Sequence, residues 1–425
     1  MPQPPTSLGA NGDTADGSDD ADDVAARGRA WLATGDPGAL WPELAPGTLQ
    51  PAADAVGAAV AAILRGQRAT LGADDGRDAY AIGIAGLITG TGPLLGHWVE
   101  RGALDASAPV AAVLARHLEQ GRRRMERIAA GVAPALAALH DGGLAPAVIK
   151  GFHTAHAYFP EPAARPIGDV DVVVAPRDVA AAEALLRDAG FAPSDVIEAP
   201  YKRDWYPPDD DGRTRSYELW HARDRWKLEL HDGLNFGQLA RYGVRLGDAA
   251  PFDGAWRVGG VPVRVATQPL LVCLLAAHLG TEPYASRLLR LVELTLVIRR
   301  DTECGGLDWA AVRELLERSG ALRFTYPALA LAQRLAPGTV DDALLARARA
   351  VSTHLTRRVV DRLTPTAPVV QDGVSLAERL MWARGPVDIA RRVALMAMPV
   401  PGQTWRHSLL AYHGRVRRLL AGRVS

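Results

Sequence analysis

Cysteine is scarce in this chain: Cys273 and Cys304 are its only two thiols in 425 residues. Two cysteines cannot make a disulfide framework for a chain of this length. Neither lies in a Cys-x-x-Cys or Cys/His cluster of the kind that binds zinc. The sequence therefore excludes the disulfide-rich secreted and zinc-ribbon classes, and it is typical of a reducing compartment.

Long apolar runs and excess charge are lacking as well. No run of about 18 uncharged apolar residues occurs, and the first residues have neither the basic start nor the apolar centre of a signal peptide. We therefore expect no membrane span and a cytoplasmic protein. The formal net charge is +0, so no overall basic field attracts nucleic acid, which we do not expect as a partner.

The patterning changes three times along the chain. Residues 1–25 are rich in Asp, Gly, Pro and Ser and are predicted to be a disordered acidic tail. Helical spacing of apolar residues predicts a helical region over 26–145, short strands and helices predict an α/β core over 146–267, and helices return over 268–425. The expected fold class is α+β, with a small mixed β-sheet flanked by two helical regions.

The most informative segment is the β-branched stretch 169–174. Side chains alternate along a strand, so Asp169, Asp171 and Val173 share one face. The valines at 170, 172 and 174 share the other, which a helix over 178–189 can cover. Two carboxylates about 6.5–7 Å apart repel each other unless a cation lies between them. Mg²⁺ is the cation that best suits such ligands. The alternative is an ordinary pair of turn or surface residues.

A second alternating segment covers 225–231, and we expect it to pair with 217–222 across a short turn. Glu229 in this strand could join the two aspartates as a third carboxylate of a metal site. The alternative is that Lys227 and Glu229 are exposed strand residues. His231 shares their face and has three interpretations: it orients Glu229, holds an acceptor, or lies at the surface.

A third feature is Lys150-Gly151, which follows the apolar run 147–149 and opens a helix. Free N–H groups at a helix N-terminus bind anions, glycine permits close approach, and lysine adds a positive charge. Arg165, just before the aspartate strand, could pair with a triphosphate or with Asp169. Lys150, Gly151 and Arg165 are therefore candidate nucleotide-binding residues.

Together these features resemble a known family. The order Ile149-Lys150-Gly151, Arg165-Pro-Ile-Gly-Asp-Val-Asp-Val-Val-Val174 and Leu228-Glu229-Leu230-His231 is similar to the uncharacterised nucleotidyltransferase family of the polymerase-β-like superfamily. Its helical His and Arg-Leu segment resembles Ala276-Ala-His278 with Arg287-Leu-Leu-Arg290. The resemblance spans about residues 120 to 420.

The resemblance implies that Asp169 and Asp171 are paired metal ligands, that Glu229 is the third carboxylate, and that Gly151 contacts a triphosphate. Two positions depart from the family pattern. The superfamily turn is usually Gly-Ser or Gly-Gly, where this chain has Lys150-Gly151, and Glu293 stands where an Asp is expected after the Arg-Leu segment.

The function implied is a nucleotidyltransferase that uses Mg²⁺ or Mn²⁺. It would move a nucleoside monophosphate from a nucleoside triphosphate to an unknown acceptor, which is a small molecule, a peptide or a protein. Asp169, Asp171 and Glu229 would hold the metal, and Glu229 could instead act as the base for the acceptor. Two alternatives stay open: a non-catalytic nucleotide-binding scaffold on the same fold, and a phosphotransferase with the same metal site.

Other polar residues favour structural roles. The arginines at 122–124 are interpreted as a solvated helix face, and His278 as a satisfied core histidine on an apolar helix. His153 and His156 are interpreted as packing or surface residues rather than as a metal site. The segment 201–217, with its paired prolines and charged residues, is predicted to be an exposed loop, either a flap for the acceptor or plain solvated chain.

Overall fold

The computed structural model describes most of residues 26–390. The predicted acidic tail, most of the predicted strand 217–222 and the chain beyond 390 lie outside the described residues. The described stretches are 26–30, 39–45, 47–73, 76–195, 201–213, 221–234, 252–281, 288–366, 380–383 and 385–390, with single positions between some of them.

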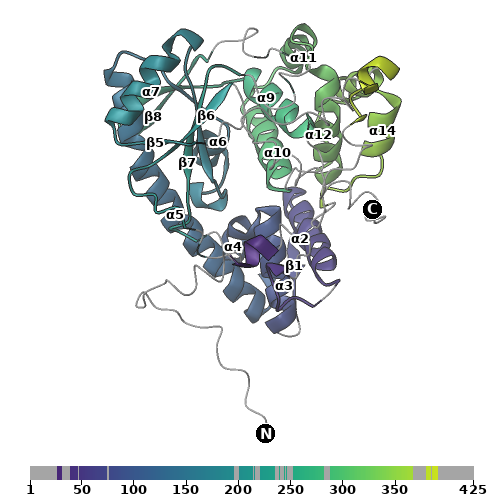
Figure 1. The fold of residues 1–425 in the computed structure, drawn as a ribbon. Helices are drawn as coiled ribbons and strands as arrows, with labels where there is room; N and C mark the ends of the chain where they lie inside the picture. The colour runs from purple at the N-terminus through teal and green to yellow at the C-terminus, as the bar shows by residue number, and fades with distance from the viewer. Residues whose placement is uncertain are drawn as a thin grey trace.

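The N-terminal region is helical, as its apolar spacing predicts, and holds one small pair of parallel strands. The longest helix is α5, which covers the stripe of apolar residues predicted over 110–140 and runs along one side of the sheet (Figure 1). The elements are α2 (Leu49–Leu64), β1 (Ala69–Leu71), α3 (Gly76–Thr89), α4 (Gly92–Glu100), β2 (Leu104–Ala106) and α5 (Ala108–Asp141).

Helices α3 and α4 are consecutive and rich in apolar residues. Within the part of the chain that the structure describes, no single helix is long and apolar enough to cross a membrane. These two reach the required length and composition only together, and they meet at an angle of 117°.

The core is a seven-stranded mixed sheet with the strand order β5-β6-β7-β4-β3-β9-β8. Strands β4 and β7 are parallel, as are β3 and β9, while the other neighbours are antiparallel. This arrangement confirms the predicted α+β class. The strands are β3 (Ala147–Ile149), β4 (Asp169–Val173), β5 (Ala192–Pro193), β6 (Lys202–Tyr206), β7 (Lys227–His231), β8 (Gly254–Val258) and β9 (Val261–Val265).

One face of the sheet is apolar and is covered by helices. Val170 and Val172 of β4 and Leu228 and Leu230 of β7 are at most 2% exposed and pack with residues of α5 and α7 (Val179–Asp188). The predicted alternation of β4, with its valines under the helix at 179–188, is thereby confirmed. Burying these four side chains contributes on the order of 1.5–3 kcal/mol each, which strongly favours one orientation of both strands.

The opposite face of the sheet is also partly covered by helices. At its β3 end Ala147, Ile149 and Val173 belong to a large apolar cluster shared with the N-terminal and C-terminal helices. Figure 1 shows the C-terminal helices in green beside the sheet and the N-terminal ones in purple below them. The helices are α6 (Gly151–Tyr158), α9 (Leu270–Thr281), α10 (Leu288–Glu303), α11 (Trp309–Arg318), α12 (Leu322–Leu335), α13 (Asp342–Val351) and α14 (His354–Val360).

The prediction that the arginines at 122–124 form a solvated helix face is wrong for Arg124 of α5. Its side chain is buried, with 3% of the residue exposed, and its guanidinium donates hydrogen bonds to backbone carbonyls just before both acid-bearing strands. The acceptors are the oxygens of Ile167 at 2.9 Å, Asp224 at 2.8 Å and Arg225 at 2.7 Å. Arg124 therefore ties the start of β4 to the start of β7.

Candidate active site

Carboxylates from three neighbouring strands lie in one row across the sheet. Asp171 of β4 is paired in register with Glu229 of β7, and Glu229 is paired with Asp204 of β6. Residues paired in register project from the same face, so the predicted sharing of a face by Asp171 and Glu229 is confirmed. Asp169 is two residues along β4 on that same face.

His231 lies between the two central carboxylates. Its Nε2 is 3.0 Å from Asp171 Oδ1 and 3.5 Å from Glu229 Oε2. One ligand-type atom from each of these three residues lies within 4.8 Å of the others, and all three side chains are buried. Of the three interpretations of His231, the surface position is wrong. The tightest set of ligand atoms is thus Asp171, Glu229 and His231, with Asp169 beside it.

Lysine side chains neutralise these acids. Lys150 Nζ is 2.8 Å from Asp171 Oδ1, and both Lys202 Nζ, at 2.7 Å, and Lys227 Nζ, at 2.8 Å, contact Glu229 Oε1. Asp171 is thus held through Oδ1, while the lysines hold Glu229 through Oε1 and His231 lies against its Oε2. The alternative in which Lys227 and Glu229 are merely exposed strand residues is wrong, because Glu229 is 6% exposed.

Burial and neighbouring charges together set the pKa values of these acids. Burial alone would raise the pKa of Asp171, but Lys150 and His231 hold the pKa of this carboxyl well below its usual range. Burial acts in the same way on Glu229, and His231 with Lys202 lowers its pKa. Burial, together with the charges of Asp171 and Glu229, raises the pKa of Asp169. Asp171 and Glu229 are therefore held in the anionic form that a metal ligand requires.

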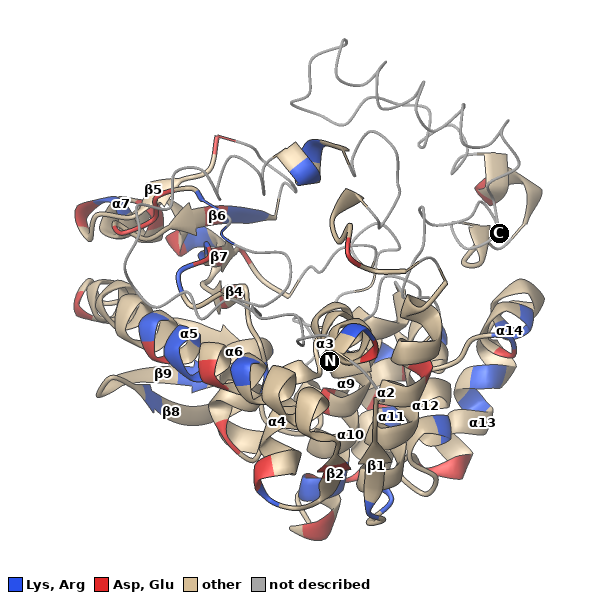
Figure 2. Cartoon of the chain, turned by 90° about the horizontal axis from the view of Figure 1, so that it is seen from below, with Lys and Arg blue, Asp and Glu red and all other residues tan. Residues whose placement is uncertain are grey.

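Strand β6 contributes charged residues to the site that the sequence did not indicate. Residues 202–206 form a strand within the segment predicted as an exposed loop, and this strand is the antiparallel partner of β7. It brings Lys202 to Glu229 and places the buried Asp204 2.6 Å from Lys227 Nζ. Figure 2 shows the basic residues of β6 beside the charged residues of β7. The segment Lys-Arg-Asp-Trp-Tyr carries no apolar alternation that would have indicated a strand.

The backbone at Lys150 is unusual. With φ 50° it is the one non-glycine residue with a positive φ among the described positions, a conformation that costs on the order of 1–3 kcal/mol. This conformation lies at the cap of α6, where β3 turns into the helix. With this conformation Lys150 caps the start of α6 and its ammonium group also contacts Asp171.

Arg165 pairs with Glu293, and not with Asp169, which the sequence suggested as a partner besides a triphosphate. Its Nη2 and Nε contact the Glu293 carboxylate at 2.8 and 3.0 Å, in a pair whose side chains are 11% and 3% exposed. Thr154 of α6 donates to the same carboxylate. A β-carbon on Gly151 would lie 2.7 Å from Arg165 Nη1, so the glycine leaves room for this guanidinium. Glu293, the departure from the family pattern, thus links α10 to the start of α6.

His278 of α9 borders the charged face of the sheet. Burial lowers the pKa of its ring well below 6.5, and Lys150 and Arg290 lower it further, while Asp171 and Glu229 act in the opposite direction. The interpretation of His278 as a core histidine is therefore incomplete, because the ring senses the charges of the candidate site.

The two histidines of α6 have the packing role that was favoured. The rings of His153 and His156 lie 5.5 and 5.3 Å from Trp256 of β8. Burial lowers the pKa of His153 to about 4, which keeps it neutral at pH 7. These rings join α6 to the edge of the sheet.

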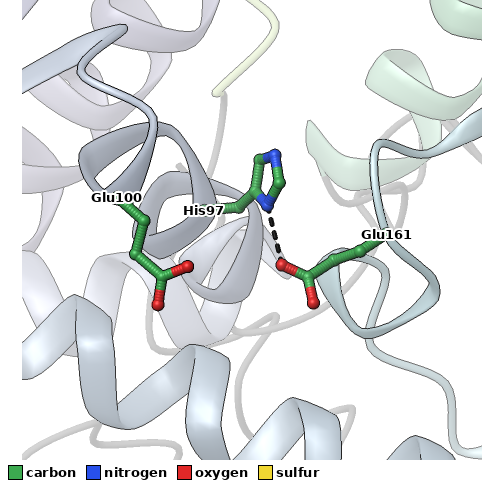
Figure 3. Close-up of side chains that lie close together, drawn as sticks. All are labelled: His97, Glu100 and Glu161. Carbon is green, nitrogen blue, oxygen red and sulfur yellow. Dashed lines mark hydrogen bonds and ion pairs between the residues drawn. The ribbon is translucent and has the colours of Figure 1, made fainter.

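A second group of possible ligands is formed by His97 and Glu100 of α4 with Glu161. Figure 3 shows the His97 ring facing the Glu161 carboxylate, and their atoms are 2.7 Å apart. Arg122 of α5 bonds Glu161 at 2.8 Å and Glu100 at 2.8 Å, so a guanidinium already supplies the positive charge. This cluster joins α4 and α5 to the segment before β4, and we assign it no metal.

Comparison with known proteins agrees with the geometry. The family model described as uncharacterised nucleotidyltransferase matches residues 89–337, which is more than half of the chain and includes every residue of the candidate site. No curated protein and no solved structure matches the chain. The match begins earlier and ends earlier than the resemblance seen in the sequence, but it contains all of its central motifs. The chain therefore belongs to the uncharacterised nucleotidyltransferase family, a family of transferases that act on a nucleotide substrate.

Proposed function

We propose that this chain uses a divalent cation, Mg²⁺ or Mn²⁺, to transfer a nucleoside monophosphate from a nucleoside triphosphate to an acceptor. The observation that carries the proposal is the convergence of Asp171 and Glu229 from two parallel strands on one buried patch. Asp169, on the same face, adds a further carboxylate. The acceptor we propose is a small molecule, a peptide or a protein, because the chain lacks an overall basic charge.

The donor atoms suit such a cation. Asp171 Oδ1 accepts from Lys150 and His231, whereas its Oδ2 accepts no hydrogen bond from the described residues. Glu229 Oε1 is held by two lysines, and its Oε2 faces His231. Asp171 thus keeps Oδ2 for a ligand, while Glu229 Oε2 shares His231 Nε2 with Asp171. Carboxylate oxygens are what Mg²⁺ and Mn²⁺ prefer, and the ion would neutralise charge on the phosphates.

In the proposed reaction an acceptor oxygen or nitrogen forms a bond to the α-phosphorus. The bond from this phosphorus to the α–β bridging oxygen breaks, and pyrophosphate leaves with the electron pair. The acceptor proton passes to water or to a carboxylate of the site. Lys150 Nζ, which contacts Asp171 Oδ1, and the N–H groups at the start of α6 would bind phosphate oxygens.

The low pKa of Glu229 favours one of its two predicted roles. A carboxylate held ionised by His231 and Lys202 is a weak base at neutral pH. We therefore assign Glu229 to metal binding rather than to proton abstraction. His231, bonded to both carboxylates, fixes their orientation.

The test measures metal binding and transfer separately. Mn²⁺ binding is followed by electron paramagnetic resonance, and transfer is followed with α- or γ-labelled triphosphates and Mg²⁺ in the presence of cell extract. Asp171→Asn should abolish both, while Asp188→Asn, an exposed aspartate at the end of α7, should change neither. Transfer of the α label with release of pyrophosphate supports the proposal.

Transfer of the γ label instead would identify a phosphotransferase. Triphosphate binding with no labelled product from any extract would favour the non-catalytic alternative. Wild-type protein that binds neither Mn²⁺ nor triphosphate would refute the proposed function.

A further inference from the structure

Arg290 of α10 is half-buried and stands out among the arginines near the sheet. Arg124 donates to backbone carbonyls, and Arg165 is tied to Glu293. Arg290, in contrast, makes no hydrogen bond or ion pair to any residue of the described stretches. A guanidinium that is partly withdrawn from water favours an anionic partner, because its charge is otherwise poorly solvated.

The position of Arg290 places it near the start of α6. It lies three residues before Glu293, and residues so spaced share one face of a helix. Glu293 is buried on that face, where it binds Arg165 and Thr154. Arg165 in turn lies against Gly151, the first residue of α6. Figure 1 shows α10 beside α6, in agreement with their contacts.

The charges around His278 give a second, independent indication. The ring of His278 on α9 is acted on by Lys150 and Arg290, and also by Asp171 and Glu229. The pKa of this one histidine thus responds to the acids of the sheet and to the side-chain charges of Lys150 and Arg290. Lys150 contacts Asp171 directly, and Arg290 on the C-terminal helices is within electrostatic reach of the same ring as the acidic patch.

We propose that Arg290 binds the terminal phosphates of the nucleoside triphosphate across from the metal-binding acids. This proposal rests on the proposed function. Arg165 was the arginine expected to bind phosphate, but its donors are used by Glu293, whereas Arg290 offers a planar set of donors that fits phosphate oxygens in pairs.

The proposal assigns a role to the C-terminal helices. The β- and γ-phosphates become the leaving pyrophosphate, and a guanidinium beside them stabilises the charge that develops there. The sheet would then hold the metal and α-phosphate, and α10 would hold the leaving group. Arg290 touches substrate in this arrangement and is a catalytic residue.

The experiment uses the full chain and isothermal titration calorimetry with ATP, AMP and inorganic tripolyphosphate, each with Mg²⁺. Arg290→Gln should weaken the binding of ATP and tripolyphosphate by roughly 10- to 100-fold, the range for a lost charge-assisted contact, and should leave AMP binding unchanged. Arg290→Lys should recover part of the affinity. Arg313→Gln, which removes the same charge from an exposed position of α11, should match the wild type.

Equal ATP and tripolyphosphate affinities for wild type and Arg290→Gln would overturn the proposal. So would an equal loss of AMP affinity, because that loss would place Arg290 at the α-phosphate or nucleoside. Mn²⁺ binding, measured on the same variants, separates the two proposals. If Asp171→Asn binds Mn²⁺ as the wild type does, the proposed metal site fails, while a selective loss of tripolyphosphate binding in Arg290→Gln still supports the phosphate site.

Discussion

Replacing Arg124 by methionine tests whether a buried arginine sets the geometry of the acid-bearing strands. Methionine keeps an apolar stem but removes every donor, so the carbonyls of Ile167, Asp224 and Arg225 lose partners at 2.7–2.9 Å. A buried carbonyl left without a partner costs about 1–3 kcal/mol. The carbonyl of Asp224 keeps a hydrogen bond from Arg127 at 3.1 Å, and the variant also relieves the cost of burying a charge. We therefore expect a net loss near the lower bound, about 2 kcal/mol for the carbonyls of Ile167 and Arg225.

The measurement is urea denaturation followed by tryptophan fluorescence, since Trp226 is buried one residue after Arg225. The matched control is Arg123→Met, which removes an exposed ion pair with Glu119 and should cost less than about 1 kcal/mol. Mn²⁺ affinity should fall about tenfold in Arg124→Met, as for other residues that support metal ligands. Stability within about 0.5 kcal/mol of wild type, with unchanged Mn²⁺ affinity, would refute this role.

Two further predictions concern buried groups. His117 has its pKa lowered by burial from 6.5 to about 4, so the unfolded chain takes up a proton below pH 6.5 that the folded chain does not. It should therefore reduce stability by about 3 kcal/mol between pH 6.5 and 4. His117→Gln should flatten the measured pH dependence over that interval, and an unchanged slope would contradict the assignment. Gly151→Ala places a β-carbon 2.7 Å from Arg165 Nη1 and should cost about 3 kcal/mol in urea denaturation, the lower end for disturbing a buried ion pair. Gly72→Ala, which meets open space, should cost little, and equal losses in the two variants would rule out the steric explanation.

The parts of the site that follow from local patterning could be predicted. The valines of β4 and the leucines of β7 alternate with acids, and this period alone places Asp171 and Glu229 on the face away from α5 and α7. The turn at Lys150-Gly151 was recognisable because an apolar run changes there to helical spacing. Because the apolar side chains of a strand must be buried on one face, the acidic side chains between them must project from the other face.

The parts that depend on distant pairing could not be predicted. Strand β6 reaches the site because it pairs with β7, and nothing in Lys202–Tyr206 itself indicates that its lysine and aspartate are buried. Glu293 looked like a departure from a family pattern, yet it binds Arg165 from 128 residues away. An ion pair between distant residues produces no repeating pattern in the sequence. The partner of a charged residue is therefore identified only in the folded chain.

The lysines around the acidic patch have a consequence for how the protein meets its ligands. Four carboxylates on one sheet face would repel each other in an empty pocket, but here Lys150, Lys202 and Lys227 supply counter-charges from the chain itself. Folding thus need not wait for an ion. Under the proposed function, a cation would bind beside carboxylates whose mutual repulsion the chain has already reduced.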